Sequence, residues 1–101
     1  MKQVYFTLTG TGYHCGTEFL EKDMTVFLEK EKDNEFDTEA ICVRLPGLGK
    51  IGHVANSVRT RIGESWSAGR LYDRIGDTAE AKVMYILPRG VLCVIGLEDE
   101  D

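Results

Sequence analysis

The sequence divides into six short segments of strand character, each bounded by glycine, proline or other turn-forming residues. They cover residues 3–9, 24–28, 40–45, 50–54, 79–87 and 91–97. Apolar and polar residues alternate in most of them, and β-branched and aromatic residues are frequent, as in strands with one buried face. In the fifth segment the alternation would put Val83, Tyr85 and Leu87 on one face. We therefore expect a mainly β fold with short helices, a small six-stranded barrel that is closed or nearly closed.

Two short helices are expected late in the chain. The first begins at the capping pair Asn56-Ser57 and ends at Gly63, with apolar residues one turn apart between them. The second has its apolar face over residues 71–75 and ends at Gly76. Both are insertions into the barrel.

The length of 101 residues suits a single domain, which we place at residues 1–97, followed by an acidic tail at residues 98–101. No apolar run approaches the roughly 18 residues of a membrane span, and the first residues lack the pattern of a signal peptide. We therefore expect no membrane partner.

The net charge of −5 is unevenly distributed. The tail carries four of these negative charges, so the rest of the chain is nearly neutral. Residues 18–39 hold nine acids and three lysines, whereas residues 44–89 hold eight basic residues and four acids. Strong, purely electrostatic binding of nucleic acid needs a concentration of Lys and Arg, so this balance disfavours it. The acids of residues 29–39 read as a solvated edge with a turn.

Cysteine and histidine residues do not form a recognisable catalytic or metal pattern. Cys15, Cys42 and Cys93 are far apart, which is typical of reduced thiols in the cytoplasm. Cys42 and Cys93 fall at apolar strand positions and are expected to be buried and inert. His14 and His53 lie in or beside loops, where a structural role is the simpler reading. We expect no metal, no cofactor and no enzymatic activity.

Two aromatic residues in loops are a different signal. Tyr13 lies in the glycine-rich loop of residues 10–16, and Phe36 lies in the turn before residues 40–45. Each ring could fold back as a lid on the core, or it could stay open as a stacking platform for a base. Asp37 could cap the following segment, or it could accept a hydrogen bond from a base edge or a sugar hydroxyl.

Three motifs resemble the HIRAN domain family, and the resemblance spans about residues 4–97. They are Gly10-x-x-Tyr13-x-x-Gly16, Asn34-Glu35-Phe36-Asp37-x-x-Ala40-Ile41-x-Val43 and Gly52-His53-Val54. The resemblance implies an OB-like β-barrel with short helices. Fused members of the family belong to helicase-like chromatin remodellers and ubiquitin ligases, a setting that suggests DNA repair, and grip the 3′ end of single-stranded DNA.

The resemblance also assigns roles to residues. Tyr13 and Phe36 would hold the terminal base, Asp37 would bond the terminal sugar hydroxyl, and His53 would reach a phosphate. The expected nucleic-acid-binding set is Tyr13, Asn34, Phe36, Asp37, His53, Asn56 and Arg59.

Several positions depart from the family pattern. Gly12 replaces an arginine, and Ala55 and Asn56 stand where a lysine is usual. Glu35 replaces the turn proline, and Glu39 replaces an asparagine. Two phosphate contacts are thus lost and negative charge is added. Arg59, Arg61, Arg44 or Lys50 could substitute as cations. We expect weak binding of a single-stranded DNA 3′ end, micromolar or weaker.

Two other functions remain open. The chain could be a protein-interaction or assembly module, including a homo-oligomer, that keeps the fold without binding DNA. The acidic face of residues 18–39 is the feature that favours it. A nuclease-like enzyme is the other alternative, and the lack of a recognisable carboxylate or metal constellation argues against it.

Overall fold

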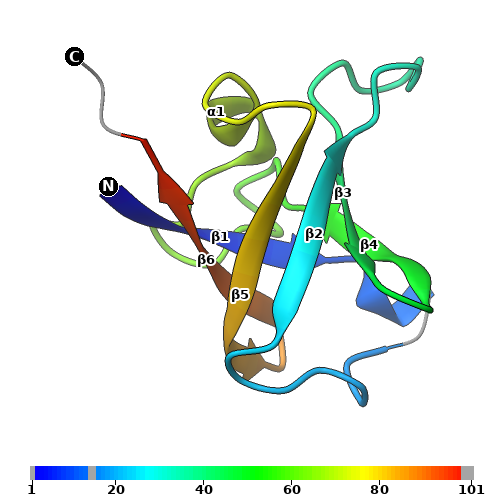
Figure 1. Ribbon diagram of the computed structural model, residues 1–101, viewed down its shortest axis with the longest axis vertical. Coiled ribbons are helices and arrows are strands. Elements are labelled where there is room, and N and C mark those ends of the chain that lie inside the picture. The colour runs from blue at the N-terminus through cyan, green and yellow to red at the C-terminus, as the bar shows by residue number, and fades with distance from the viewer. Residues whose placement is uncertain (1, 14–15, 99–101) are drawn as a thin grey trace.

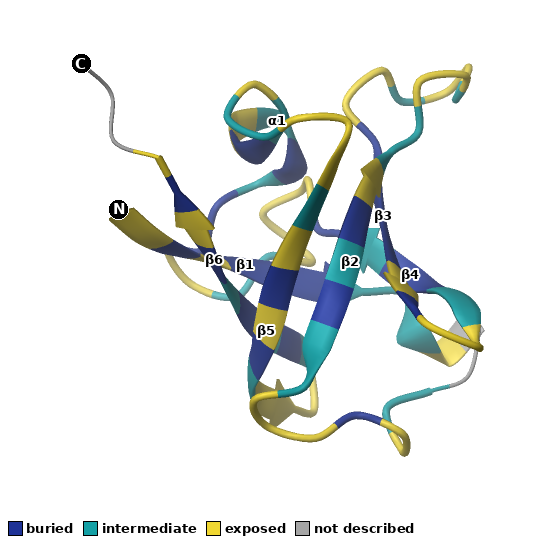
Figure 2. Ribbon diagram, in the orientation of Figure 1, coloured by how far each residue is buried: buried dark blue, intermediate teal, exposed yellow. Residues whose placement is uncertain are grey.

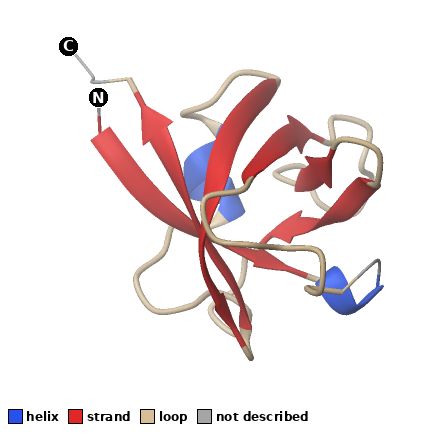
Figure 3. Ribbon diagram, turned by 60° about the horizontal axis from the view of Figure 1, so that its bottom comes forward, coloured by secondary structure: helices blue, strands red, loops and turns tan. Residues whose placement is uncertain are grey.

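The computed structural model describes residues 2–13 and 16–98, with only the main chain of Tyr13 included, as a closed six-stranded antiparallel barrel. Its strands are β1 (Lys2–Thr9), β2 (Thr25–Lys30), β3 (Ile41–Leu45), β4 (Gly49–Val54), β5 (Thr78–Leu87) and β6 (Gly90–Leu97). They pair in the order β1-β4-β3-β2-β5-β6 (Figure 1). Two helical elements accompany them, the 3-10 turn η1 (Thr11–Tyr13) and the helix α1 (Ala68–Tyr72) (Figure 3). The expected mainly β barrel is confirmed.

The core fills the barrel because alternate strand residues point inward. On β1, Val4, Phe6 and Leu8 are buried, and Phe6 lies opposite the buried Cys93 of β6. Buried bands alternate with exposed or intermediate ones along β2 and β5 in Figure 2, and most of the loops are exposed or intermediate. The alternation in the sequence therefore identified most of the core.

The outer half of β5 differs from the expectation. Tyr85 and Leu87 do not share the buried face of Val83; they are 51% and 39% exposed. The register between β5 and β6 shifts between Val83 and Tyr85, so a bulge breaks the alternation there. Beyond the bulge the apolar side chains of β5 reach the surface, whereas Val91 opposite them on β6 stays buried in the core.

Strands β1 and β4 approach each other closely where the barrel closes. They pair only through Leu8 with Val54 and Thr9 with His53. A Cβ atom on Gly52 would lie 2.4 Å from the main-chain oxygen of Thr9, so only glycine fits there. The glycine of the Gly52-His53-Val54 motif thus lets β4 meet β1, and this contact fixes the position of His53.

The prediction of a helix between Asn56 and Gly63 is wrong. The amide of Arg61 donates to the carbonyl of Ser57 in a single turn, but the chain does not continue as a helix. Instead, the amide of Ile62 donates to the hydroxyl of Thr7 on β1, which also bonds the hydroxyl of Ser65 at 2.8 Å. These tertiary hydrogen bonds replace the helical ones and hold residues 62–65 against the barrel.

The second expected helix forms, but over fewer residues. Ser67 caps α1 by accepting a hydrogen bond from the amide of Arg70, and the helix ends at Tyr72, with Asp73 as its C-cap, rather than at Gly76. Just before it, Trp66 forms a parallel bridge to β1 through its amide and the carbonyl of Tyr5. None of the described helices is long and apolar enough to cross a membrane.

Candidate nucleic-acid interface

The loop of residues 31–40 joins β2 to β3 and is braced by its own hydrogen bonds. The amide of Glu31 donates to the carbonyl of Ala40 at 2.9 Å and closes the base of the loop. At the tip, the side-chain oxygen of Asn34 accepts from the amides of Phe36 at 2.9 Å and Asp37 at 3.0 Å. This Asx arrangement stabilises the turn locally, so the loop holds its shape without support from the core.

Phe36 stands out from this loop with 98% of its surface exposed. It therefore is not a lid on the core, which was one of the two readings of the sequence. The hydrogen bonds hold the main chain of the turn, and the ring keeps its faces open to solvent. A ring exposed in this way can stack on a base.

Asp37 lies beside Phe36 and uses one carboxylate oxygen to accept from the amide of Glu39 at 2.9 Å. This contact fits the capping role that the sequence allowed. Among the described residues no hydrogen bond engages the other oxygen, Oδ2, which keeps the capacity to accept one. Asp37 can therefore brace the loop and accept a hydroxyl donor at the same time.

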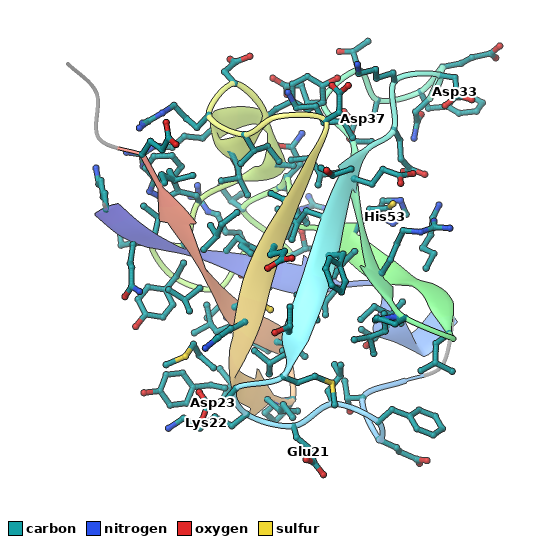
Figure 4. The ribbon with its side chains drawn as sticks, viewed as in Figure 1. Glu21, Lys22, Asp23, Asp33, Asp37 and His53 are labelled. Carbon is teal, nitrogen blue, oxygen red and sulfur yellow. The ribbon has the colours of Figure 1, made fainter. Side chains whose placement is uncertain are left out.

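His53 lies on β4 below the loop, on the same side of the barrel as Asp33 and Asp37 (Figure 4). Its Nε2 is 2.6 Å from Oε1 of Glu31, and the ammonium of Lys50 donates to the other oxygen of Glu31 at 2.7 Å. Because an ionised carboxylate only accepts hydrogen bonds, Nε2 of His53 carries the proton. Glu31 thus binds two of the candidate phosphate ligands, His53 and Lys50.

Burial alone would raise the pKa of Glu31, but hydrogen bonds and charge attraction from Lys50 and His53 outweigh it and lower the pKa. Glu31 is therefore ionised at neutral pH. Its side chain is 19% exposed, so the expectation of a solvated edge is wrong for this acid. Its contacts link residues 19 and 22 positions apart, which a local sequence pattern does not reveal.

Asn56 ties the loop to α1. Its side-chain oxygen accepts from the amide of Gly69 at 2.8 Å, and its Nδ2 lies 3.4 Å from Oε1 of Glu39. The carboxylate of Glu39 fills the space where a Cβ atom on Gly69 would stand. Asn56 is therefore a brace in this structure, while the side chain of Arg59 is exposed three residues further on.

The glycine-rich loop approaches the same region from the other side. The 3-10 turn η1 lies against β4, and the amide of Gly16 donates to the carbonyl of Thr11 at 2.8 Å. Gly10 and Gly16 have φ values of 79° and 70°, which favour glycine. The side chain of Tyr13, together with His14 and Cys15, lies outside the described residues.

The structure thus brings Asn34, Phe36 and Asp37 together in one loop. Glu31 links His53 to the base of that loop, and Glu39 links Asn56 to it. Arg59 makes no described contact with the loop. Within residues 31–40 five acids face one lysine, so the surroundings of Phe36 are strongly negative.

The described residues contain no group of three or more His, Cys, Asp or Glu that could hold a metal ion. Cys42 and Cys93 are buried free thiols, as expected. Burial raises the pKa of Cys93 to about 12, so this thiol stays protonated and unreactive.

Fold and loop together define a class of protein: a small closed antiparallel barrel with an exposed aromatic ring on a braced loop at its rim. The family profile of the HIRAN domain matches residues 1–88 of the 101. The chain therefore belongs to the HIRAN domain family, a family of nucleic-acid-binding modules, and the resemblance seen in the sequence is confirmed. No curated protein and no solved structure matches it.

Proposed function

We propose that this HIRAN domain binds the 3′ end of single-stranded DNA, weakly, by base stacking and hydrogen bonds. The observation that carries the proposal is the 98% exposed ring of Phe36 on a hydrogen-bonded turn. A ring held open in this way supports stacking, because a base that covers it removes apolar surface from water. The role is binding rather than catalysis.

Each neighbour of Phe36 has a proposed part. Phe36 stacks on the terminal base, to which the family resemblance also assigns Tyr13. The free oxygen of Asp37 accepts the 3′-hydroxyl of the terminal sugar, and His53 donates to a phosphate. Asn34 keeps the turn in shape, and Asn56 holds the loop to α1. Arg59 supplies a cation at the edge of the proposed DNA site.

The charges keep this binding weak. Stacking contributes about 1–3 kcal/mol per base, whereas association costs roughly 4 kcal/mol or more. The acids of the loop repel phosphates, and Glu31 already engages Nε2 of His53 and one N–H of Lys50, so a phosphate would compete with this carboxylate for both side chains. The proposed affinity is therefore micromolar or weaker and falls as salt rises.

The terminal hydroxyl tests the proposal. Fluorescence anisotropy at low salt compares two 5′-labelled oligothymidylates of about ten nucleotides, a length within the range of OB-fold sites. One ends in a 3′-hydroxyl and the other in a 3′-phosphate. The hydroxyl form is expected to bind several times more tightly, because a phosphate would face the carboxylate of Asp37. Equal affinity for the two ends would contradict end recognition.

Replacing Glu31 with Gln is expected to strengthen binding of the hydroxyl oligonucleotide. The change removes one negative charge and releases His53 and Lys50 toward the phosphate, so affinity should rise roughly threefold to tenfold. Glu80→Gln is the matched control, because Glu80 is an exposed acid on β5 and the change in net charge is the same. A Glu31 variant that binds no better than the Glu80 control would show that His53 and Lys50 do not reach the DNA.

Assembly is the second candidate function. Five acids around Phe36 suit a positively charged protein surface better than a phosphate chain.

A further inference from the structure

A groove lies on the outer face of the barrel, away from the candidate DNA site. It has a volume of about 530 Å³ and lies between β1, β5 and β6 on one side and residues 62–66 on the other. Tyr5 and Tyr85, which are 43% and 51% exposed, and Trp66 supply its rings. The groove is large enough for an aromatic side chain and its neighbours.

Positive charge lies beside the rings of this groove. Lys2 and Arg70 lie 5.5 and 3.9 Å from the centre of the Trp66 ring, and Lys22 lies 5.7 Å from the centre of the Tyr85 ring. Among the described lining residues, the charged ones are Lys2 and Glu64. The groove therefore suits an apolar side chain that is flanked by acids.

The loop of residues 31–40 has that chemistry. It projects Phe36 at its tip, and acids occupy every second position from residue 31 to residue 39. The phenyl ring complements the apolar groove, and the carboxylates complement its cations. The loop and the groove thus match in polarity and in charge.

A molecule cannot place its own loop in its own groove. Figure 4 shows Asp33 and Asp37 at the top of the barrel and Lys22, which lies over Tyr85, at the bottom. The loop is braced by its own hydrogen bonds and closes on itself at residues 31 and 40, so it cannot cross the barrel. The fitting occupant is the loop of another copy.

We infer that this chain self-associates head to tail, with the loop of residues 31–40 of one copy inserting Phe36 into the Tyr5–Trp66–Tyr85 groove of the next. Because the two surfaces differ, the contact is heterologous and each copy can both give and receive a loop. The interface is small and largely electrostatic, so association is weak and is reversed by salt.

Complementing variants test this inference without DNA. Phe36→Ser removes the phenyl ring of the loop and leaves the groove intact. Tyr85→Glu blocks the groove and leaves the ring of Phe36 intact. In sedimentation velocity at low salt, up to about 1 mM protein, a range for weak contacts, the wild-type sedimentation coefficient is expected to rise with concentration. Each variant alone is expected to remain a monomer, and an equimolar mixture of the two is expected to form a one-to-one dimer.

Two further variants keep the test decisive. Lys2→Glu changes an exposed charge at the groove, needs no repacking, and is expected to weaken association at least fivefold. Phe19→Ala removes an exposed phenyl ring elsewhere and is expected to leave association unchanged. The inference is overturned if the wild type stays monomeric, if Phe36→Ser associates as the wild type does, or if the folded variants fail to complement each other. A monomeric wild type whose Tyr5 and Tyr85 NMR signals shift with oligonucleotide would assign the groove to DNA instead.

Discussion

Phe36→Ala is expected to weaken binding of a 3′-hydroxyl oligonucleotide roughly fivefold to more than 100-fold, the loss that corresponds to a stacked base at about 1–3 kcal/mol. The fold should be unaffected, because the ring is 98% exposed and contributes nothing to the core. The free energy of unfolding should therefore change by no more than about 0.5 kcal/mol. Anisotropy titration measures the first quantity and urea denaturation the second.

Phe19→Ala is the control for this experiment, because Phe19 is also an exposed phenyl ring on a turn. It should leave DNA binding unchanged. If Phe36→Ala unfolds the domain, the ring is structural and the assignment of the site is lost. If Phe36→Ala binds as well as the wild type, stacking on this ring does not hold the DNA.

Ile41→Ala is expected to have the larger effect on stability, a loss of about 2–5 kcal/mol. Ile41 begins β3, is fully buried, and pairs across the sheet with Lys30 at the base of the loop. Truncating Ile41 leaves a cavity in the barrel core, which is built from residues far apart in the sequence. Urea denaturation measures the loss as a lower midpoint with an unchanged slope.

Val58→Ala provides the matched comparison, since Val58 is 78% exposed. It should change the free energy of unfolding by no more than about 0.5 kcal/mol. An Ile41 variant as stable as the Val58 variant would mean that the barrel core does not lie where the buried strands place it.

The strands were predictable because their alternation and turn residues are local signals. Strand β4, for example, follows directly from the Pro46-Gly47 turn and the Gly52-His53-Val54 motif. The false helix after Asn56 shows where local signals fail. Its capping pair and apolar spacing were real, but Thr7, far away in sequence, took the hydrogen bond that would have extended it.

The candidate site follows the same division. The braced turn of Asn34, Phe36 and Asp37 is compact in sequence, so its motif was visible. The role of the Glu31 carboxylate could not be seen in the sequence, because its partners Lys50 and His53 come from another strand. The groove could not be predicted from the sequence for two reasons. The bulge in β5 exposes Tyr85, which the alternation had placed on the buried face, and residues 62–66 form a wall of the groove that no sequence pattern indicated.

Phe36 has a part in both proposals, and this links them. A ring that is stacked on a DNA end is not available to the groove of another copy. If both proposals hold, a 3′-hydroxyl oligonucleotide dissociates the head-to-tail assembly, and a domain in the assembly is closed to DNA. The acids beside Phe36, which weaken DNA binding, would then serve the contact between copies.

The most direct test of the proposed function is an NMR titration with a short 3′-hydroxyl oligothymidylate at low salt. At protein concentrations where the domain is monomeric, signals of the loop of residues 31–40 and of His53 are expected to shift, and those of Tyr5 and Tyr85 are expected to stay unchanged. A 3′-phosphate form is expected to produce much smaller changes. Absence of shifts at millimolar DNA, or equal shifts with both ends, would contradict the proposed function.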